Sequence, residues 1–111
     1  MWGANNQQNQ ERFFPVEKEK VFAALLKVVQ EKFKVKEADD FTMSITFSSG
    51  ASAFTWGENF SAQVLPREGG AAIEIYGVGK VGGQIQQSTR TNKLINQILS
   101  DTTDILKAER G

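Results

Sequence analysis

Glu58 is the residue of this sequence best placed for acid–base chemistry. It follows Trp56 and Gly57 in a stretch where Phe54, Trp56 and Phe60 share one strand parity, and Glu58 falls on that same apolar parity. A carboxylate facing a core is costly to ionise, and the raised pKa that results suits a general acid or base. The alternative, which we favour, is that Gly57 forms a bulge that returns Glu58 to water or to a lysine.

A glycine-rich connection offers a second chemistry. Gly77, Gly79 and Gly82 match the G-x-G-x-x-G spacing that lets a backbone approach a dinucleotide pyrophosphate. That motif needs a parallel strand–helix–strand unit, whereas here a single helical segment follows and the sequence then ends. We therefore interpret the glycines as an ordinary connection between a strand and a helix.

Cations flank this connection and the start of the last helical segment. They are Lys80, Arg90 and Lys93. Free backbone N–H groups at a helix start, together with nearby cations, make a generic anion-binding site. Solvated charges around a helix start are the alternative interpretation.

Metal and thiol chemistry are poorly supported by the residue types. The chain has no histidine and no cysteine, which removes thiolate and imidazole metal ligands, histidine-dependent triads and disulfides. Asp101 and Asp104 lie one helical turn apart, but two carboxylates without a third ligand make a poor metal site. We expect no cofactor and no bound metal, and we rank an enzymatic function below a binding function.

Two helices are predicted from apolar stripes with a period of 3.6 residues. The first follows Pro15 and covers about 17–33, and its stripe is Val21, Phe22, Leu25, Val28, Val29 and Phe33. The second covers about 88–107, and its stripe is Leu94, Ile95, Ile98, Leu99, Thr102, Ile105 and Leu106.

Strands are predicted between the helices. Alternation over 41–48 places Phe41, Met43, Ile45 and Phe47 on one face and hydroxyl side chains on the other. Further strands are expected between the helices at 34–37, 54–64 and 71–76, separated by short turns, and a short edge strand is expected at 12–14, before the first helix. Short turns join antiparallel strands. The sequence therefore predicts an α+β fold, a four- or five-stranded antiparallel meander with both helices packed on one face.

The length and the net charge of the chain limit its domain organisation and its possible partners. The 111 residues fit one domain over 12–111, preceded by a disordered Asn/Gln-rich tail over 1–11. Thirteen basic and thirteen acidic residues cancel, which removes the general attraction to nucleic acid and to anionic membranes. Residues 1–10 contain no apolar run, so we expect neither a signal peptide nor a membrane span, and a cytoplasmic protein.

The pattern over 16–107 resembles a group of small bacterial α+β domains. The resemblance rests on the opening helix VEKEKVFAALLKVVQEKFKVKEAD, on an SxxxWGE-like strand pair over 52–58, and on the long closing helix. The opening helix is also similar to the start of helix-grip lipid-binding domains, and two helices on a sheet are similar to the TATA-binding-protein-like fold. None of these resemblances supplies a catalytic residue.

Three functions remain open from the sequence. The first is a non-enzymatic module that binds an apolar small molecule between sheet and helices. The second is a protein–protein module, a homodimer for example, that uses the outer sheet face or an edge strand. The third is a carboxylate-dependent enzyme that uses Glu58. The residues expected to line the apolar site are Phe54, Trp56, Glu58, Phe60 and Ile98.

Overall fold

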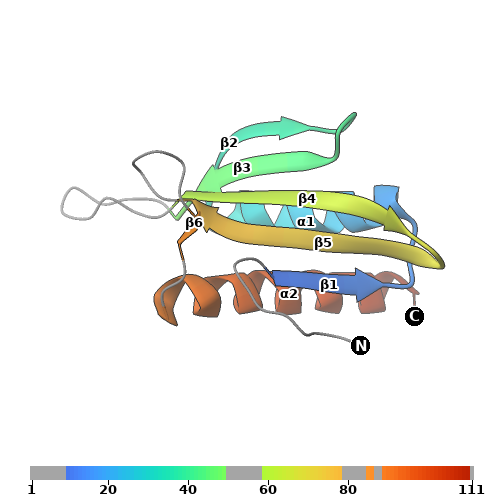
Figure 1. The fold of residues 1–111 in the computed structure, drawn as a ribbon. Helices are drawn as coiled ribbons and strands as arrows, with labels where there is room; N and C mark the ends of the chain where they lie inside the picture. The colour runs from blue at the N-terminus through green and yellow to red at the C-terminus, as the bar shows by residue number, and fades with distance from the viewer. Residues whose placement is uncertain (1–9, 50–58, 79–84, 87–88, 111) are drawn as a thin grey trace.

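The computed structural model describes residues 10–49, 59–78, 85–86 and 89–110. Within these ranges a sheet forms one layer and two helices form the other (Figure 1). The elements in chain order are β1 (Gln10–Phe14), α1 (Lys18–Lys32), β2 (Lys34–Asp39), β3 (Ser44–Ser48), β4 (Asn59–Arg67), β5 (Gly70–Val78), β6 (Ile85–Gln86) and α2 (Thr89–Arg110).

The sheet has the strand order β1-β5-β4-β3-β2, and every pair in it is antiparallel. β6 pairs with β5 at Gly77 and Val78, beyond the end of β1, so β1 and β6 share one side of β5. This arrangement confirms the predicted antiparallel α+β fold. The two-residue strand β6 is an addition that the sequence did not predict.

One face of the sheet is apolar and faces the helices. Its buried side chains are Ile45, Phe47, Phe60, Ala62, Val64, Ile73 and Ile75. The opposite face carries half-buried polar side chains, including Ser44, Thr46, Ser48, Ser61 and Gln63. The alternation predicted from the sequence therefore separates the core from the outer face as expected.

α1 lies across the apolar face and contacts β2, β4 and β5. Its predicted stripe is buried from Val21 to Val29, and Phe33, at the C-terminal cap, is half-buried. The backbone N–H of Phe33 donates to the carbonyl of Val29 at 2.8 Å, which closes the last turn. The helix end thus fixes an aromatic side chain at the border of the core.

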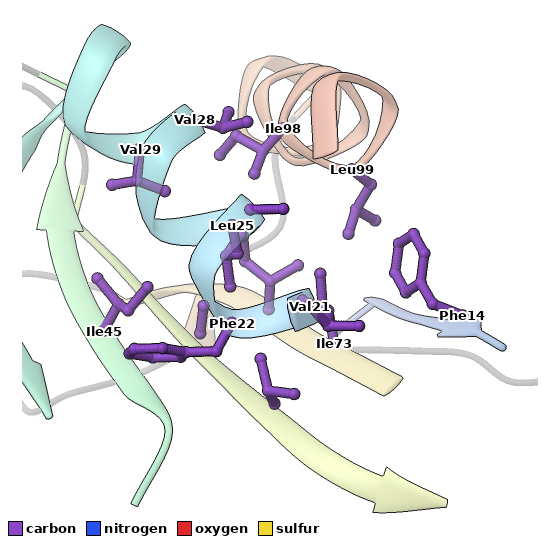
Figure 2. Packing of buried hydrophobic residues seen from close by; sticks show 14 of the residues in the cluster. Phe14, Val21, Phe22, Leu25, Val28, Val29, Ile45, Ile73, Ile98 and Leu99 are labelled. Carbon is purple, nitrogen blue, oxygen red and sulfur yellow. The ribbon is translucent and has the colours of Figure 1, made fainter. Parts of the chain in front are cut away.

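α2 packs against α1 and β5. Figure 2 shows Ile98 directed toward Val28 of α1, and Leu99 directed toward Phe14 of β1. The one buried polar side chain recorded in the described core is Thr102, whose hydroxyl donates to the carbonyl of Ile98 at 2.8 Å. That bond removes the cost of an unpaired buried hydroxyl.

The strand predicted over 41–48 is shorter than expected, and this corrects the placement of Phe41. Asp39 accepts hydrogen bonds on its carboxylate from the N–H groups of Phe41 at 2.9 Å and Thr42 at 3.3 Å. This side-chain turn competes with strand pairing. Met43 then takes a φ of 60°, and β3 begins at Ser44. Phe41 is 91% exposed as a result, not in the core.

The predicted strand boundary near the start of the chain also differs by a few residues from the observed one. The edge strand expected at 12–14 is β1, which begins at Gln10. Residues 1–9, where the tail was expected, lie outside the described ranges. Neither helix in the described ranges combines the length and apolarity needed to cross a membrane.

Candidate functional site

Three phenylalanines form an aromatic cluster (Phe33, Phe47 and Phe60) at one end of the sheet. Phe47 and Phe60 lie opposite each other on β3 and β4, and their rings stack with centroids 5.2 Å apart and an interplanar angle of 11°. Phe33 meets both rings edge-on, at 5.3 Å from Phe47 and 6.0 Å from Phe60. Edge-to-face contacts of this kind are favourable beyond simple burial.

The elements explain why these rings meet. Phe47 stands near the end of β3, Phe60 near the start of β4, and Phe33 directly after α1. The strand partner of Phe60 on the other side is Gly77, which has no side chain. Residues 49–58 connect β3 to β4, so the chain leaves and re-enters the sheet beside the aromatic cluster.

The chemistry available to the aromatic cluster is apolar contact. Phe47 is fully buried and Phe60 is 1% exposed, whereas Phe33 is half-buried and reaches the border of the core. Phe33 is therefore the ring of the aromatic cluster that is partly accessible to solvent, and the rings of Phe47 and Phe60 are enclosed in the core.

The structure describes two of the five residues expected to line an apolar site. Phe60 and Ile98 both belong to the continuous buried core, Phe60 from β4 and Ile98 from α2. Phe54, Trp56 and Glu58 lie outside the described residues. The sequence did not single out Phe33 and Phe47 as residues of the apolar site, and it did not predict their contact with Phe60, because separate segments of the chain bring the three rings together.

The expected anion site is described in part. Arg90 lies in the first turn of α2, Lys93 is exposed on the same helix, and Lys80 lies outside the described residues. Gly77 pairs within β5, while Gly79 and Gly82 are outside the described ranges. The antiparallel pairing of β5 with β4 and β6 supports the interpretation against a dinucleotide fold.

Two shallow surface depressions have linings that are described completely, and both lie along the line where α1 and α2 meet. The first has a volume of about 270 Å³ and the second about 220 Å³. Small-molecule sites usually occupy about 300 to 1,000 Å³. Pro15, Val16, Glu17, Lys20, Leu106 and Glu109 line the first; Val28, Glu31, Lys32, Asp101, Asp104 and Ile105 line the second.

The second depression contains an ion pair between the helices. Lys32 Nζ lies 2.7 Å from Asp101 Oδ2, and Gln97 donates to the other carboxylate oxygen at 3.0 Å. The hydrogen bond from Lys32 holds the pKa of Asp101 below its ordinary value, against the opposing effect of burial. The same hydrogen bond raises the pKa of Lys32. Asp101 therefore links α2 to the end of α1 through this ion pair.

Replacing Asp101 with asparagine is expected to lower Tm by a few degrees at most at pH 7, because exposed ion pairs contribute little. The folded pKa of Asp101 is depressed, so its contribution is present above about pH 4 and is lost as pH falls through the folded pKa. Thermal unfolding of wild type and variant should therefore converge in acid.

Asp104→Asn is the matched control for this measurement. Asp104 is exposed one helical turn further on and makes no ion pair with any residue that the structure describes. Its replacement should leave Tm unchanged at pH 7. An equal loss in both variants would show that net charge, not the contact with Lys32, sets the effect.

Acidic residues in the described ranges form no group of three or more that could hold a metal ion.

Comparison with known proteins gives similarity at the level of fold. The crystal structure of Ara h 8.0201 matches with a TM-score of 0.58 at 13% sequence identity, covering 89% of this chain and 96% of that chain. It has a helix-grip fold, and the chain described above is a remote helix-grip-like α+β domain. No model of a protein family matches the sequence, and a search of curated proteins finds no match.

Proposed function

We propose that this domain is a non-enzymatic module that binds an apolar small molecule at the aromatic end of the sheet. The observation that carries the proposal is the aromatic cluster: two buried, stacked rings with a third, half-buried ring at the border of the core. An aromatic surface that reaches the border of a core suits an apolar ligand, because rings offer a large contact area with few rotatable bonds.

Sequence and fold support the same location. The connection over 49–58 carries Phe54 and Trp56, and it joins the strands that hold Phe47 and Phe60. The helix-grip-like arrangement places a sheet against helices, and ligand pockets commonly form between such layers. In this proposal Trp56 and Phe33 contact the ligand, while Phe60 and Ile98 belong to the packed core behind it.

The experiment is a fluorescence titration with 1-anilinonaphthalene-8-sulfonate, together with native mass spectrometry of the freshly purified protein. We expect saturable binding with one site per chain. Trp56→Ala should weaken binding roughly tenfold to a hundredfold, because burying one aromatic side chain contributes about that much. Tm should change little, which separates loss of binding from loss of folding.

Phe41→Ala is the control, because Phe41 is an aromatic residue that is 91% exposed in the turn before β3. It lies at the opposite end of the β3 strand from Phe47, so its removal should leave the titration unchanged. An apo mass with no co-purified molecule, combined with no saturable dye binding, would rule out the apolar site. Equal weakening by Phe41→Ala and Trp56→Ala would show that the dye binds nonspecifically.

A further inference from the structure

The edge strand β2 has one side without a partner in the described part of the chain. β2 is the last strand in the order β1-β5-β4-β3-β2, and it pairs only with β3 (Figure 1). The pairing with β3 shifts register between Val35 and Glu37, so Lys36 is an extra, bulged residue. An edge strand without a partner can pair with a strand of another chain unless charged residues, proline or a covering segment prevents it.

The sequence of β2 is complementary to itself when reversed. It reads Lys34-Val35-Lys36-Glu37-Ala38-Asp39, with two cations, then two anions, and one small apolar residue within each half. If a second copy runs antiparallel, with the two-fold axis between positions 36 and 37, Lys34 faces Asp39 and Lys36 faces Glu37. A parallel copy would instead place like charges side by side, which is unfavourable.

The bulge at Lys36 also makes the order of inner-face and outer-face residues along β2 the same in both directions. Lys34, Glu37 and Asp39 pair with outer-face serine and threonine residues of β3, whereas Val35 and Ala38 pair with the inner-face residues Phe47 and Ile45.

The side chain of Lys36 also lies on the outer face, because its Nζ donates to Asn59 Oδ1 at 2.9 Å. The faces along β2 thus run outer, inner, outer, outer, inner, outer. Directly opposed residues must share a face. In a regular strand, residues related by a two-fold axis between positions 36 and 37 would lie on opposite faces. The bulge in β2 places them on the same face.

The backbone groups follow the same symmetry. The N–H of Val64 donates to the carbonyl of Met43 at 2.9 Å, so the alternate residues Ile45 and Phe47 direct their backbone groups toward β4. The residues of β3 that lie between these direct their backbone groups toward β2, where they pair with Lys34, Glu37 and Asp39. Val35 and Ala38 are left to direct their N–H and C=O groups to the open edge. In the antiparallel copy, these two positions face each other.

We propose that β2 is the homodimerisation edge of this protein, and that a second copy of the chain adds across it to form one continuous antiparallel sheet. Val35 and Ala38 exchange backbone hydrogen bonds with Ala38 and Val35 of the second copy. Lys34 and Lys36 pair with Asp39 and Glu37 on the outer face, and the ammonium of Lys36 has enough donors to keep its bond to Asn59. The inference is independent of the proposed ligand.

Charged residues on an edge strand often prevent it from pairing with another chain. The order of the charges distinguishes an edge that is protected in this way from an edge that dimerises. A guarded edge needs only charge, commonly lysine, of any order. Here both signs occur, in an order that pairs opposite charges at both charged positions of a reversed copy, 34 with 39 and 36 with 37. Because the contact is one strand pair, it is small and weak, and its ionic part is sensitive to salt.

The test is sedimentation velocity of the full chain over a wide concentration range. The wild type should show a monomer–dimer equilibrium that shifts toward monomer at high salt. Lys36→Glu alone and Glu37→Lys alone should each weaken the dimer at least about tenfold, because each creates like-charge pairs twice in the two-fold contact. An equimolar mixture of these two variants should form the dimer again, since each variant supplies the charge that the other lacks.

Two further variants keep the test decisive. The double variant Lys36→Glu/Glu37→Lys should dimerise as the wild type does, because the swapped charges remain complementary. Lys27→Glu makes the same charge change on the exposed side of α1 and should leave dimerisation unchanged. A wild type that stays monomeric at every concentration would overturn the proposal. So would a Lys27→Glu variant that weakens the dimer as much as Lys36→Glu, or a folded double variant or mixture that stays monomeric.

Discussion

Phe47→Ala is expected to destabilise the domain by about 4 kcal/mol, which is typical of removing a buried aromatic side chain. Phe47 is fully buried, and its ring contacts Phe60 and Phe33 at centroid distances of 5.2 and 5.3 Å. The loss therefore includes the transfer of the ring to water, the cavity left behind and two aromatic contacts. Domains of this kind are stable by only about 5–15 kcal/mol, so the variant should be marginally folded.

Urea denaturation followed by far-UV circular dichroism measures this effect. The midpoint should fall sharply, while the slope stays close to that of the wild type if the transition remains two-state. Phe33→Ala should cost less than Phe47→Ala, because the ring of Phe33 is only half-buried. Phe41→Ala should change stability by less than about 0.5 kcal/mol, as surface substitutions usually do. A loss below about 1 kcal/mol for Phe47→Ala would contradict the packing of the aromatic cluster.

The helices and the two faces of the sheet could be predicted from sequence because each depends on local periodicity. The stripe from Val21 to Val29 has one helical period, and Ile45 and Phe47 alternate with hydroxyl residues. Periodicity fails at boundaries. Phe41 continues the alternation, but the carboxylate of Asp39 accepts its N–H and ends the strand pattern. A hydrogen bond between neighbours in sequence overrode an apolar pattern that was otherwise consistent.

Contacts between distant segments could not be predicted in this way. The placement of β1 beside β5 joins residues about 60 positions apart, and the pairing of Lys32 with Asp101 spans 69 positions. The aromatic cluster is a similar case, since Phe33, Phe47 and Phe60 each fit a local stripe or alternation. Their meeting depends on where α1 ends over the sheet. Local patterns therefore identified the residues, while the topology determined which of them form a site.

Gly70→Ala is expected to cost about 3 kcal/mol, at the upper end of the usual cost of overpacking. A methyl group on Gly70 would meet the carbonyl oxygen of Phe14, and it would lie 2.9 Å from Cα of Pro15. These are backbone atoms at the end of β1, where Phe14 pairs with Ala71, so no side chain can rotate away. Relief requires β1 to move off β5.

The position of that movement can be measured by hydrogen exchange. In Gly70→Ala, amides of β1 should lose protection more than amides of β3, because β1 alone is displaced by the added methyl group. β1 also contacts α2 through the hydrogen bond from Arg12 to Thr103, at 3.5 Å, so α2 should loosen on the side that faces β1. Uniform loss of protection across all strands would indicate global destabilisation instead.

Gly69 provides the matched control, because it lies one residue before Gly70, in the turn that precedes β5. It has a φ of 84°, and an added methyl group there would meet nothing within 4 Å. Gly69→Ala should cost roughly 1–2 kcal/mol from left-handed backbone strain alone, and Gly69→Asn should cost less because asparagine tolerates that conformation. Unlike Gly70→Ala, neither variant should release β1. A larger loss in Gly69→Ala than in Gly70→Ala would mean that turn strain, rather than the close approach of β1, limits this corner of the sheet.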